Sequence, residues 1–329
     1  MLLNKLKDQI MRAIALLLAC LLVGFNAATA DDTRHIEYPT YFTHANGLSI
    51  AYQDFGQADK GTILLVMGLG AQMIAWNDEI VTSLVDAGYR VIRFDNRDVG
   101  WSEKLYDEST PGILTGIRFK LGMSLGSPYK LDDMAADAIG LLDALNIAKV
   151  HVVGASMGGM IVQIMTARYP ERVQSLTSIM SSSGAAHLPQ GTVNLNMSAE
   201  NKTREEAINA TVDLVQQFGG SVGQMDRDVL YKRLARYYDR SHYAPGGARQ
   251  FWAILDSGDR VELLKSIKQP TVGLHGVEDT LVPYSHGEHT AEMVSGSKLV
   301  ALEGMGHSID DASLPIIVSE ILAVAAQAE

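Results

Sequence analysis

A serine near the middle of the chain has the surroundings of a nucleophile. The segment Gly154-Ala155-Ser156-Met157-Gly158 follows an aliphatic run, Val150–Val153, and leads into a helix-like pattern. A sharp strand-to-helix turn of this kind requires small neighbours, and it holds the serine hydroxyl out above a sheet. The Gly-x-Ser-x-Gly string alone is weak evidence, because so short a pattern also arises by chance. Its position between a strand and a helix is what predicts a nucleophile at Ser156.

A base and an orienting acid follow this serine in the chain. A serine hydroxyl attacks only when a base takes its proton, and the base needs an acid to orient it. Asp279 follows the strand-like run Thr271–Leu274, and His307 follows the next run, Lys298–Leu302. Because the carboxyl ends of parallel strands meet at one edge of a sheet, we expect the three side chains to meet there.

Other polar residues near these positions have alternative interpretations. Glu278 is the rival of Asp279 as the orienting acid, and His275 is interpreted as a structural residue at a strand end. His286 and His289 have a spacing conceivable for a metal on a helix, but without a further matched ligand a solvated surface explains them better. We therefore expect no metal and no other cofactor.

Short aliphatic runs separated by helical patterns predict the scaffold of this site. Each run ends at, or within two residues of, a Gly, Ser or Asp, and the alternation predicts a parallel sheet with helices on both faces. An earlier stretch, His35–Phe55 with an Asn46-Gly47 turn, predicts an antiparallel hairpin at the sheet edge. The predicted buried strands are Thr62–Met67, Arg90–Asp95, Val150–Gly154, Leu176–Met180, Thr271–Leu274 and Lys298–Leu302.

This alternation breaks between about Ala185 and Ser266. Three amphipathic segments replace it, at Ser198–Phe218, Asp226–Arg240 and around Ala248–Leu264. The break is far longer than an ordinary connection, so we interpret it as a helical cap inserted between two strands, with a solvated structural insertion as the alternative. The expected organisation is a signal peptide at 1–30, a first core part at 31–184, the cap at 185–266 and a second core part at 267–329.

Composition and the first thirty residues limit the class of protein. The 329 residues are 47% hydrophobic and 20% charged, which is typical of a soluble globular enzyme. A net charge of −11 argues against nucleic acid or an anionic membrane as a partner. Lys5, Lys7 and Arg12, the apolar run Ala13–Phe25 and the small-residue site before Asp31 have the layout of a secretory signal peptide. We expect cleavage, export to the periplasm or the medium, and no stable membrane span after processing.

Five motifs in order give the chain a family resemblance. "MGLGA", "RFDNRDVGWS", "GASMGGM", "LHGVEDTLVP" and "EGMGH" resemble those of the α/β-hydrolase superfamily over Tyr41–Ala325, and most of all its serine esterase-like branch with the anthracycline methylesterase-type hydrolases. The resemblance implies an α/β-hydrolase fold, with a mostly parallel central sheet, helices on both faces and an inserted helical cap.

The same resemblance implies a role for individual residues. Ser156 would be the nucleophile, His307 the base and Asp279 its orienter, and the backbone N–H groups of Leu69 and Met157 would form the oxyanion hole. The chain departs from the family at the oxyanion loop, where many members have His-Gly and this chain has Met-Gly. In the "RFDNRDVGWS" motif, Asp95 and Arg97 would brace the loop near the nucleophile.

These observations predict a serine hydrolase that cleaves carboxylic esters through an acyl-enzyme intermediate. The substrate is expected to be an uncharged, moderately apolar small molecule, with Trp76 and Trp252 as candidate contacts that packing also explains. Two alternatives stay open. The same three residues could serve a C–C bond hydrolase, an acyltransferase or a perhydrolase, and the scaffold could belong to a non-catalytic ligand-binding protein.

Overall fold

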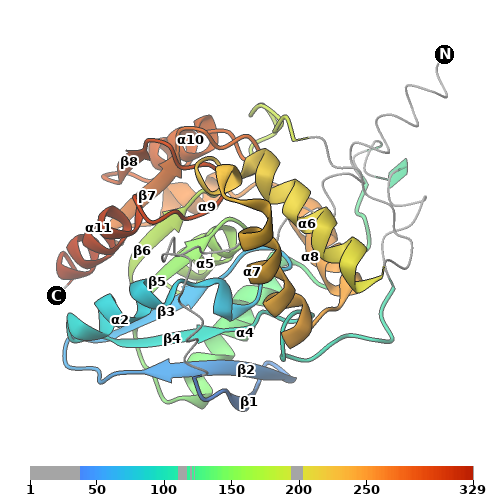
Figure 1. Cartoon of the computed structure of the whole chain (residues 1–329). Helices are drawn as coiled ribbons and strands as arrows, with labels where there is room; N and C mark the ends of the chain where they lie inside the picture. Colours follow the sequence, from blue (N-terminus) through green and yellow to red (C-terminus); the bar gives the residue numbers. More distant parts are fainter. Residues whose placement is uncertain (1–37, 110–116, 119–120, 122, 194–202, 329) are drawn as a thin grey trace.

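A mostly parallel sheet forms the centre of the molecule (Figure 1). The structure, a computed structural model, describes residues 38–109, 117–118, 121, 123–193 and 203–328. The sheet has eight strands in the order β1-β2-β4-β3-β5-β6-β7-β8. They are β1 (Tyr41–Ala45), β2 (Leu48–Phe55), β3 (Thr62–Val66), β4 (Arg90–Phe94), β5 (Val150–Ala155), β6 (Val173–Ile179), β7 (Thr271–Gly276) and β8 (Lys298–Leu302).

The pairing of these strands follows the predicted pattern. β1 and β2 form an antiparallel hairpin that adds to β4 at one side, and all remaining pairs are parallel. The hairpin turn at Asn46 and Gly47 has positive φ at both residues, as its Asn-Gly sequence predicts. β6 begins at Val173, earlier than the predicted start at Leu176. The predicted start was late because Gln174 and Ser175 interrupt the aliphatic run. The predicted fold class is confirmed.

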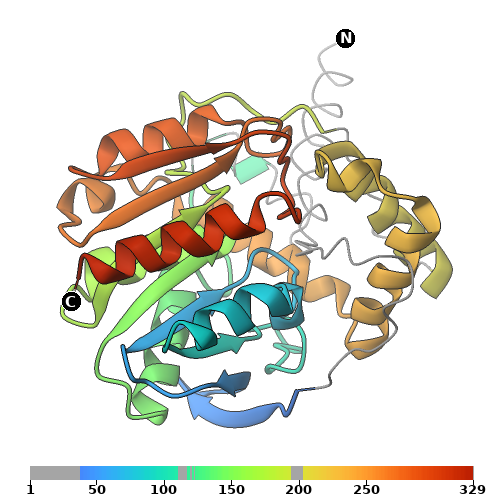
Figure 2. The same ribbon diagram turned by 60° about the vertical axis from the view of Figure 1, so that its left-hand side comes forward.

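Helices cover both faces of the sheet. α2 (Asp78–Asp86) and α11 (Leu314–Ala326) lie on one face, as Figure 2 shows. On the other face, α4 (Leu131–Ala144) and α5 (Met157–Arg168) pack together, and α9 (Val261–Ser266) and α10 (Ser285–Met293) continue the layer. The sheet is therefore the middle of three layers, and its central strands β3 and β5 are buried on both sides for that reason.

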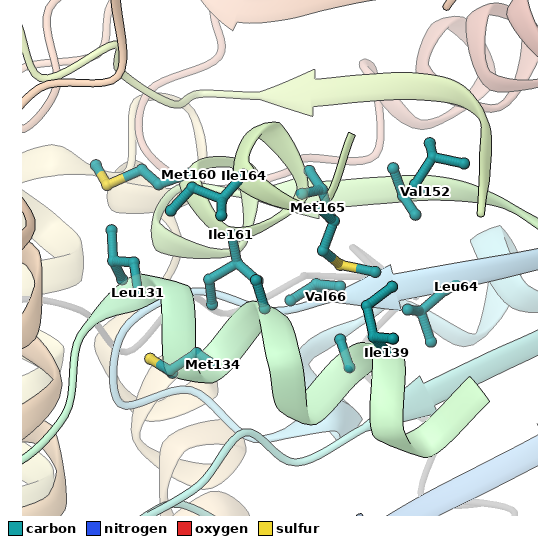
Figure 3. Close-up of a cluster of buried hydrophobic side chains, with 14 of the residues drawn as sticks. Leu64, Val66, Leu131, Met134, Ile139, Val152, Met160, Ile161, Ile164 and Met165 are labelled. Carbon is teal, nitrogen blue, oxygen red and sulfur yellow. The ribbon is translucent and has the colours of Figure 1, made fainter. Parts of the chain in front are cut away.

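Alternation along the strands divides the core between the two layers. Leu64 and Val66 of β3 face α4 and α5, whereas Ile63 and Leu65 face α2 and α11. Figure 3 shows the first of these clusters, in which Met160, Ile161, Ile164 and Met165 of α5 lie beside Leu131, Met134 and Ile139 of α4. Each such side chain, fully buried, contributes about 1.5–3 kcal/mol relative to exposure. This packing fixes α5, and with it the turn at which α5 begins.

Between β6 and β7 the described part of the chain contains helices and no strand. We call four of these elements the inserted helices: α6 (Arg204–Phe218), η3 (Val222–Gln224), α7 (Arg227–Arg240) and α8 (Ala244–Ser257). α6 and α7 begin at the caps Thr203 and Asp226, whose side chains accept backbone N–H groups. Ile208, Val212, Phe218, Leu230 and Leu234 give the inserted helices an apolar cluster of their own. α9, by contrast, packs on α5.

Some expectations fall outside the described residues. The predicted signal peptide at 1–30 is among them, as are the first residues of the predicted segment at Ser198–Phe218. Within the described ranges, no helix is both long enough and apolar enough to cross a membrane.

Candidate active site

Ser156 lies at the turn between β5 and α5, in a backbone conformation that few residues adopt. Its φ is 54° and its ψ is −117°, and such a conformation costs about 1–3 kcal/mol for a residue other than glycine. The Ser156 N–H donates to the Ile179 carbonyl at 2.9 Å. A Cβ on Gly154 would lie 2.2 Å from the Gly158 carbonyl oxygen, and one on Gly158 would lie 2.0 Å from the Val66 carbonyl oxygen. Both glycines are therefore required by backbone packing.

Ser156, His307 and Asp279 form a continuous chain of hydrogen bonds. The Ser156 Oγ is 3.0 Å from the His307 Nε2, and the His307 Nδ1 is 2.6 Å from the Asp279 Oδ2. The three residues follow β5, β8 and β7 and meet at one edge of the sheet. All are buried, with exposed fractions of 4%, 0% and 5%. Because the carboxylate accepts the proton on Nδ1, the unprotonated Nε2 faces the hydroxyl.

The Asp279 carboxylate is held in one orientation. Its Oδ1 accepts the N–H groups of Leu281 and Val282 at 2.9 and 2.8 Å, which leaves Oδ2 for His307. Burial opposes ionisation, but the attraction of His307 and the hydrogen bonds from His275 and His307 outweigh burial and lower the pKa of Asp279 to about 2. Asp279 is therefore an anion at neutral pH.

The two residues that could have competed for the roles of acid and base make other contacts. Glu278 is exposed, and its backbone N–H donates to the Met305 carbonyl. The Nε2–H of His275 donates to the Val282 carbonyl at 2.8 Å, and this nitrogen lies 3.5 Å from the Asp279 Oδ2. His275 thus supports the loop that carries Asp279.

The inserted helices hold the loop of His307. The His307 backbone N–H donates to the Phe218 carbonyl at the end of α6 at 2.7 Å, and the Phe218 ring meets the imidazole edge-on at 5.9 Å. A Cβ on Gly220 would lie 2.2 Å from the Gly306 nitrogen, so the two loops touch through their backbones. Sequence analysis missed Phe218. The available signal was the pair Gly219-Gly220, since such glycines mark close backbone approaches.

The loop after β3 carries one of the two amides expected at the oxyanion hole. Gly68–Ala71 is a β-turn, in which the Ala71 N–H donates to the Gly68 carbonyl at 3.3 Å and Gly70 has a φ of 68°. The other amide, of Met157, belongs to the first residue of α5. Among the described groups, neither the Leu69 nor the Met157 N–H has an acceptor. As far as the described residues go, both donors are free for a ligand.

Side chains of the loop after β4 brace the loop after β3. The Asp95 Oδ1 accepts the N–H of Met73, which begins η2 (Met73–Ala75), at 2.7 Å, and the Asn96 amide donates to the Met67 carbonyl at 2.8 Å. Arg97 forms a two-pronged pair with Asp137 of α4, with both contacts at 2.6 Å. Asp95 thus has the bracing position that the resemblance implied, whereas the side chain of Arg97 binds α4.

A cavity of about 90 Å³ lies between the oxyanion loop and the inserted helices. Leu69 and Gly70 form its side toward the sheet, and Ile208, Leu234 and Tyr237 are among the residues on its other side. Most of its lining is apolar. Such a cavity suits an uncharged group rather than an ion.

The two tryptophans proposed as substrate contacts have different surroundings. Trp76 is 0% exposed and belongs to the core beneath α2, so packing accounts for it. Trp252, on α8, is 5% exposed and belongs to no such cluster, and the indole nitrogens of both tryptophans have no hydrogen-bond partner among the described residues. Neither side chain lines the cavity, and a substrate contact by Trp252 stays a prediction.

The two histidines considered for a metal bind serines instead. His286 and His289 accept or donate through Nδ1 to Ser182 and Ser183 at 2.7 and 2.8 Å. Their surroundings are therefore partly buried and differ from the solvated surface that the sequence favoured. In the ranges that the structure describes, no three His, Cys, Asp or Glu side chains are grouped as metal ligands would be.

Comparison with known proteins agrees with this geometry. A family model described as the alpha/beta hydrolase fold matches residues 61–309. The chain belongs to this family. As an α/β-hydrolase it is an enzyme of the hydrolase class, and its similar relatives are named as esterases and hydrolases.

Individual relatives span most of this α/β-hydrolase. Rhodomycin D methylesterase DnrP of Streptomyces peucetius is 27% identical over 318 residues, which cover 87% of this chain and 96% of that protein. A 2-hydroxy-6-oxononadienedioate/2-hydroxy-6-oxononatrienedioate hydrolase of Paraburkholderia xenovorans is 26% identical over 268 residues, covering 79% and 84%. The structure of a meta-cleavage product hydrolase from Pseudomonas fluorescens has a TM-score of 0.69 at 19% identity, covering 88% and 98%.

Proposed function

We propose that this α/β-hydrolase cleaves carboxylic esters through an acyl-enzyme on Ser156. The observation that carries the proposal is the unbroken hydrogen-bonded chain from the Ser156 hydroxyl through His307 to the Asp279 carboxylate. Such a chain makes the hydroxyl nucleophilic, because the proton has an acceptor and the resulting imidazolium has a counter-charge.

The proposed reaction uses each of these groups in turn. Ser156 Oγ attacks the ester carbonyl while its proton moves to the His307 Nε2. The carbonyl oxygen becomes an oxyanion that the Leu69 and Met157 amides bind. His307 then gives the proton to the leaving alkoxide, which departs as an alcohol. Water attacks the acyl-enzyme by the same route, with His307 as its base.

The ester class is supported by the relatives and by the cavity. A methylesterase is among the proteins similar to this chain over most of both lengths. The apolar lining beside Leu69 suits an uncharged acyl or alcohol part. We therefore propose a small, uncharged ester as substrate, and Trp252 as a side chain near its path.

A second candidate reaction uses the same residues. The similarity to a 2-hydroxy-6-oxononadienedioate/2-hydroxy-6-oxononatrienedioate hydrolase favours cleavage of a C–C bond next to a ketone. Incubating the purified protein with simple esters and, separately, with vinylogous diketones distinguishes the two reactions. The acid and alcohol are expected from the esters; turnover of diketones alone would replace the ester proposal with C–C hydrolysis.

The nucleophile is tested by removing its oxygen. Ser156→Ala is expected to abolish nearly all turnover of short-chain esters, by about 10⁴-fold or more. A fluorophosphonate probe is expected to label the wild-type protein at Ser156 and to leave Ser156→Ala unlabelled. Folded wild-type protein that neither turns over esters nor reacts with the probe would favour a ligand-binding role on this scaffold.

We also propose that the protein is exported. The basic front, apolar run and small-residue site of residues 1–30 support this. Amino-terminal sequencing of protein from the periplasm or medium is expected to start at Asp31. Full-length protein found only inside the cell would contradict export.

A further inference from the structure

Gln250 of α8 joins the oxyanion loop to the loop after β4. Its Oε1 accepts the Gly70 N–H at 2.7 Å, and its Nε2 donates to the Arg97 carbonyl at 2.7 Å. The side chain is fully buried. The Gln250 amide therefore accepts a hydrogen bond from one backbone segment and donates one to the other. Neither Gly70 nor Arg97 contributes a side-chain atom to these bonds.

The Gly70 N–H that Gln250 binds belongs to the central peptide of the turn in the oxyanion loop. In the turn Gly68–Ala71, the positive φ of Gly70 at the third position is that of a type II turn. Type I and type II turns differ by a rotation of the central peptide, which here joins Leu69 to Gly70. A hydrogen bond from the Gly70 N–H to a fixed acceptor holds this peptide in one orientation and anchors the turn. The Leu69 N–H belongs to the preceding Gly68–Leu69 peptide, and it is held through the Leu69 Cα that the two peptides share.

The helix that carries Gln250 is itself fixed to the core. Arg249, the preceding residue, binds both carboxylate oxygens of Asp98 at 2.8 Å, and the two side chains are 1% and 0% exposed. A Cβ on Gly246, one turn earlier, would lie 2.0 Å from the Asp98 carbonyl oxygen. The amide of Gln250 thus acts from a rigid support, which is the condition for preorganising a neighbouring loop.

We propose that Gln250 is a positioning residue for the oxyanion hole. By linking the Gly70 N–H to the Arg97 carbonyl, it anchors the turn Gly68–Ala71 and thereby fixes the place at which the Leu69 N–H meets the negative oxygen of the transition state. The proposal rests on the proposed function, since it assigns a support to the same site. Gln250 does not touch the reacting atoms, and its effect belongs to the transition state rather than to substrate binding.

The test replaces the amide by an apolar group of similar length. Gln250→Met removes both hydrogen bonds. The matched control is Gln53→Met: Gln53 of β2 is also buried and also bridges, between Arg93 and Tyr38, but it lies outside the site. For each protein we would measure kcat and KM on a short ester. We would also measure inhibition by an alkyl trifluoromethyl ketone, which forms an oxyanion on the serine, and hydrogen exchange of the 67–73 peptide.

Gln250→Met is expected to lower kcat about tenfold with KM changed less than about threefold, because a misdirected donor affects the transition state. The ketone inhibition constant is expected to rise by about the same factor, and exchange of the 67–73 peptide to accelerate. Gln53→Met is expected to keep kcat and ketone affinity within about twofold of wild type. Unchanged kcat and ketone affinity in folded Gln250→Met, or a loss of kcat without a loss of ketone affinity, overturns the proposal.

Two further outcomes are separated by design. If Gln250→Met does not fold, Gln250→Leu takes its place, because a smaller apolar side chain also removes both hydrogen bonds. Wild-type kcat and ketone affinity in Gln250→Leu overturns the proposal, and a joint loss supports it. Failure of the ester hypothesis would give a different result, because the wild-type protein itself would then neither turn over esters nor bind the ketone.

Discussion

Asp279 determines which nitrogen of His307 carries the proton. Its carboxylate accepts only, so Nδ1 must donate and Nε2 is left as an acceptor for the Ser156 hydroxyl. The low pKa of Asp279, about 2, keeps its carboxylate ionised through the whole neutral range. The orientation of the acid is fixed by two backbone N–H groups of its own loop rather than by solvent.

Asp279→Asn is expected to lower kcat by about 10³–10⁴-fold, because an amide can donate to Nδ1 and favours the wrong tautomer. The shape of the site is kept, so KM and the melting temperature should change little. Glu278→Gln, one residue earlier and exposed, is the matched control and is expected to keep wild-type kcat. Steady-state kinetics on one ester checks both variants. A large loss in Glu278→Gln with near-normal Asp279→Asn would assign the acid to Glu278.

Residues whose side-chain chemistry few other residue types can perform could be found from the sequence. Residues that act only by contacting main-chain groups could not. Ser156, Asp279 and His307 each follow a recognisable strand, and few other residues can perform their chemistry. Gln250 and Phe218 act on main-chain groups of Gly70 and His307, which every residue possesses. Their positions carry no motif, and only the three-dimensional arrangement identifies them.

At the scale of the elements, the residues that follow the strand ends determine which helices and loops contact one another. Three serines, Ser181–Ser183, follow the end of β6 after Met180, and Ser182 and Ser183 bind histidines of α10. The sequence located α10 only as a region with His, Glu and His close together, because nothing local indicates which strand end the histidines face. The same limit applies to α8 and α9, whose shared segment was predicted as one helix although Gly258 separates them.

His286 is expected to make the stability of the protein depend on pH. Burial, together with the nearby charge of His275, lowers the pKa of His286 below its ordinary value of 6.5, although the hydrogen bond to Pro189 and the charge of Asp279 act the other way. The unfolded chain therefore takes up a proton first as the pH falls. The free energy of unfolding is expected to decrease below about pH 6.5 and to be fully retained above it.

Urea titrations between about pH 5 and pH 8 measure this dependence. In His286→Gln the part of the slope due to this imidazole should vanish, while Gln can still donate to Pro189 and accept from Ser182. His44→Gln, on an exposed position of β1, serves as the control and should retain the wild-type slope. A slope that is the same in His286→Gln and in the wild type would show that other groups cause the dependence.

At the scale of the molecule, polar pairs attach the inserted helices to the sheet. Arg240 at the end of α7 binds Asp95 at 2.9 Å, and Arg249 of α8 binds Asp98. Asp95 and Asp98 belong to the loop that also braces the oxyanion loop. The inserted helices therefore act as a fixed wall of the site at these contacts. Sequence could predict the insertion from its length, but not its attachment, since Arg249 and Asp98 are 151 residues apart.

The pair of Arg249 and Asp98 gives the last prediction. Hydrogen bonds from Arg249, the Leu105 N–H and the Tyr129 hydroxyl outweigh burial and lower the pKa of Asp98. Arg249→Met leaves this carboxylate buried without its counter-charge, which is expected to reduce the free energy of unfolding by about 3–5 kcal/mol. Adding Asp98→Asn removes the stranded charge while an Asn tolerates the positive φ at that position.

The double variant is therefore expected to be more stable than Arg249→Met alone, and urea unfolding of the four proteins of this cycle gives the coupling energy. Arg204→Met is the control, because Arg204 pairs with Asp239 on the exposed side of the inserted helices and its loss should change stability little. Equal, small effects of Arg249→Met and Arg204→Met would mean that the attachment of α8 depends on apolar packing. In that case apolar packing, rather than the pair of Arg249 and Asp98, would give Gln250 its rigid support.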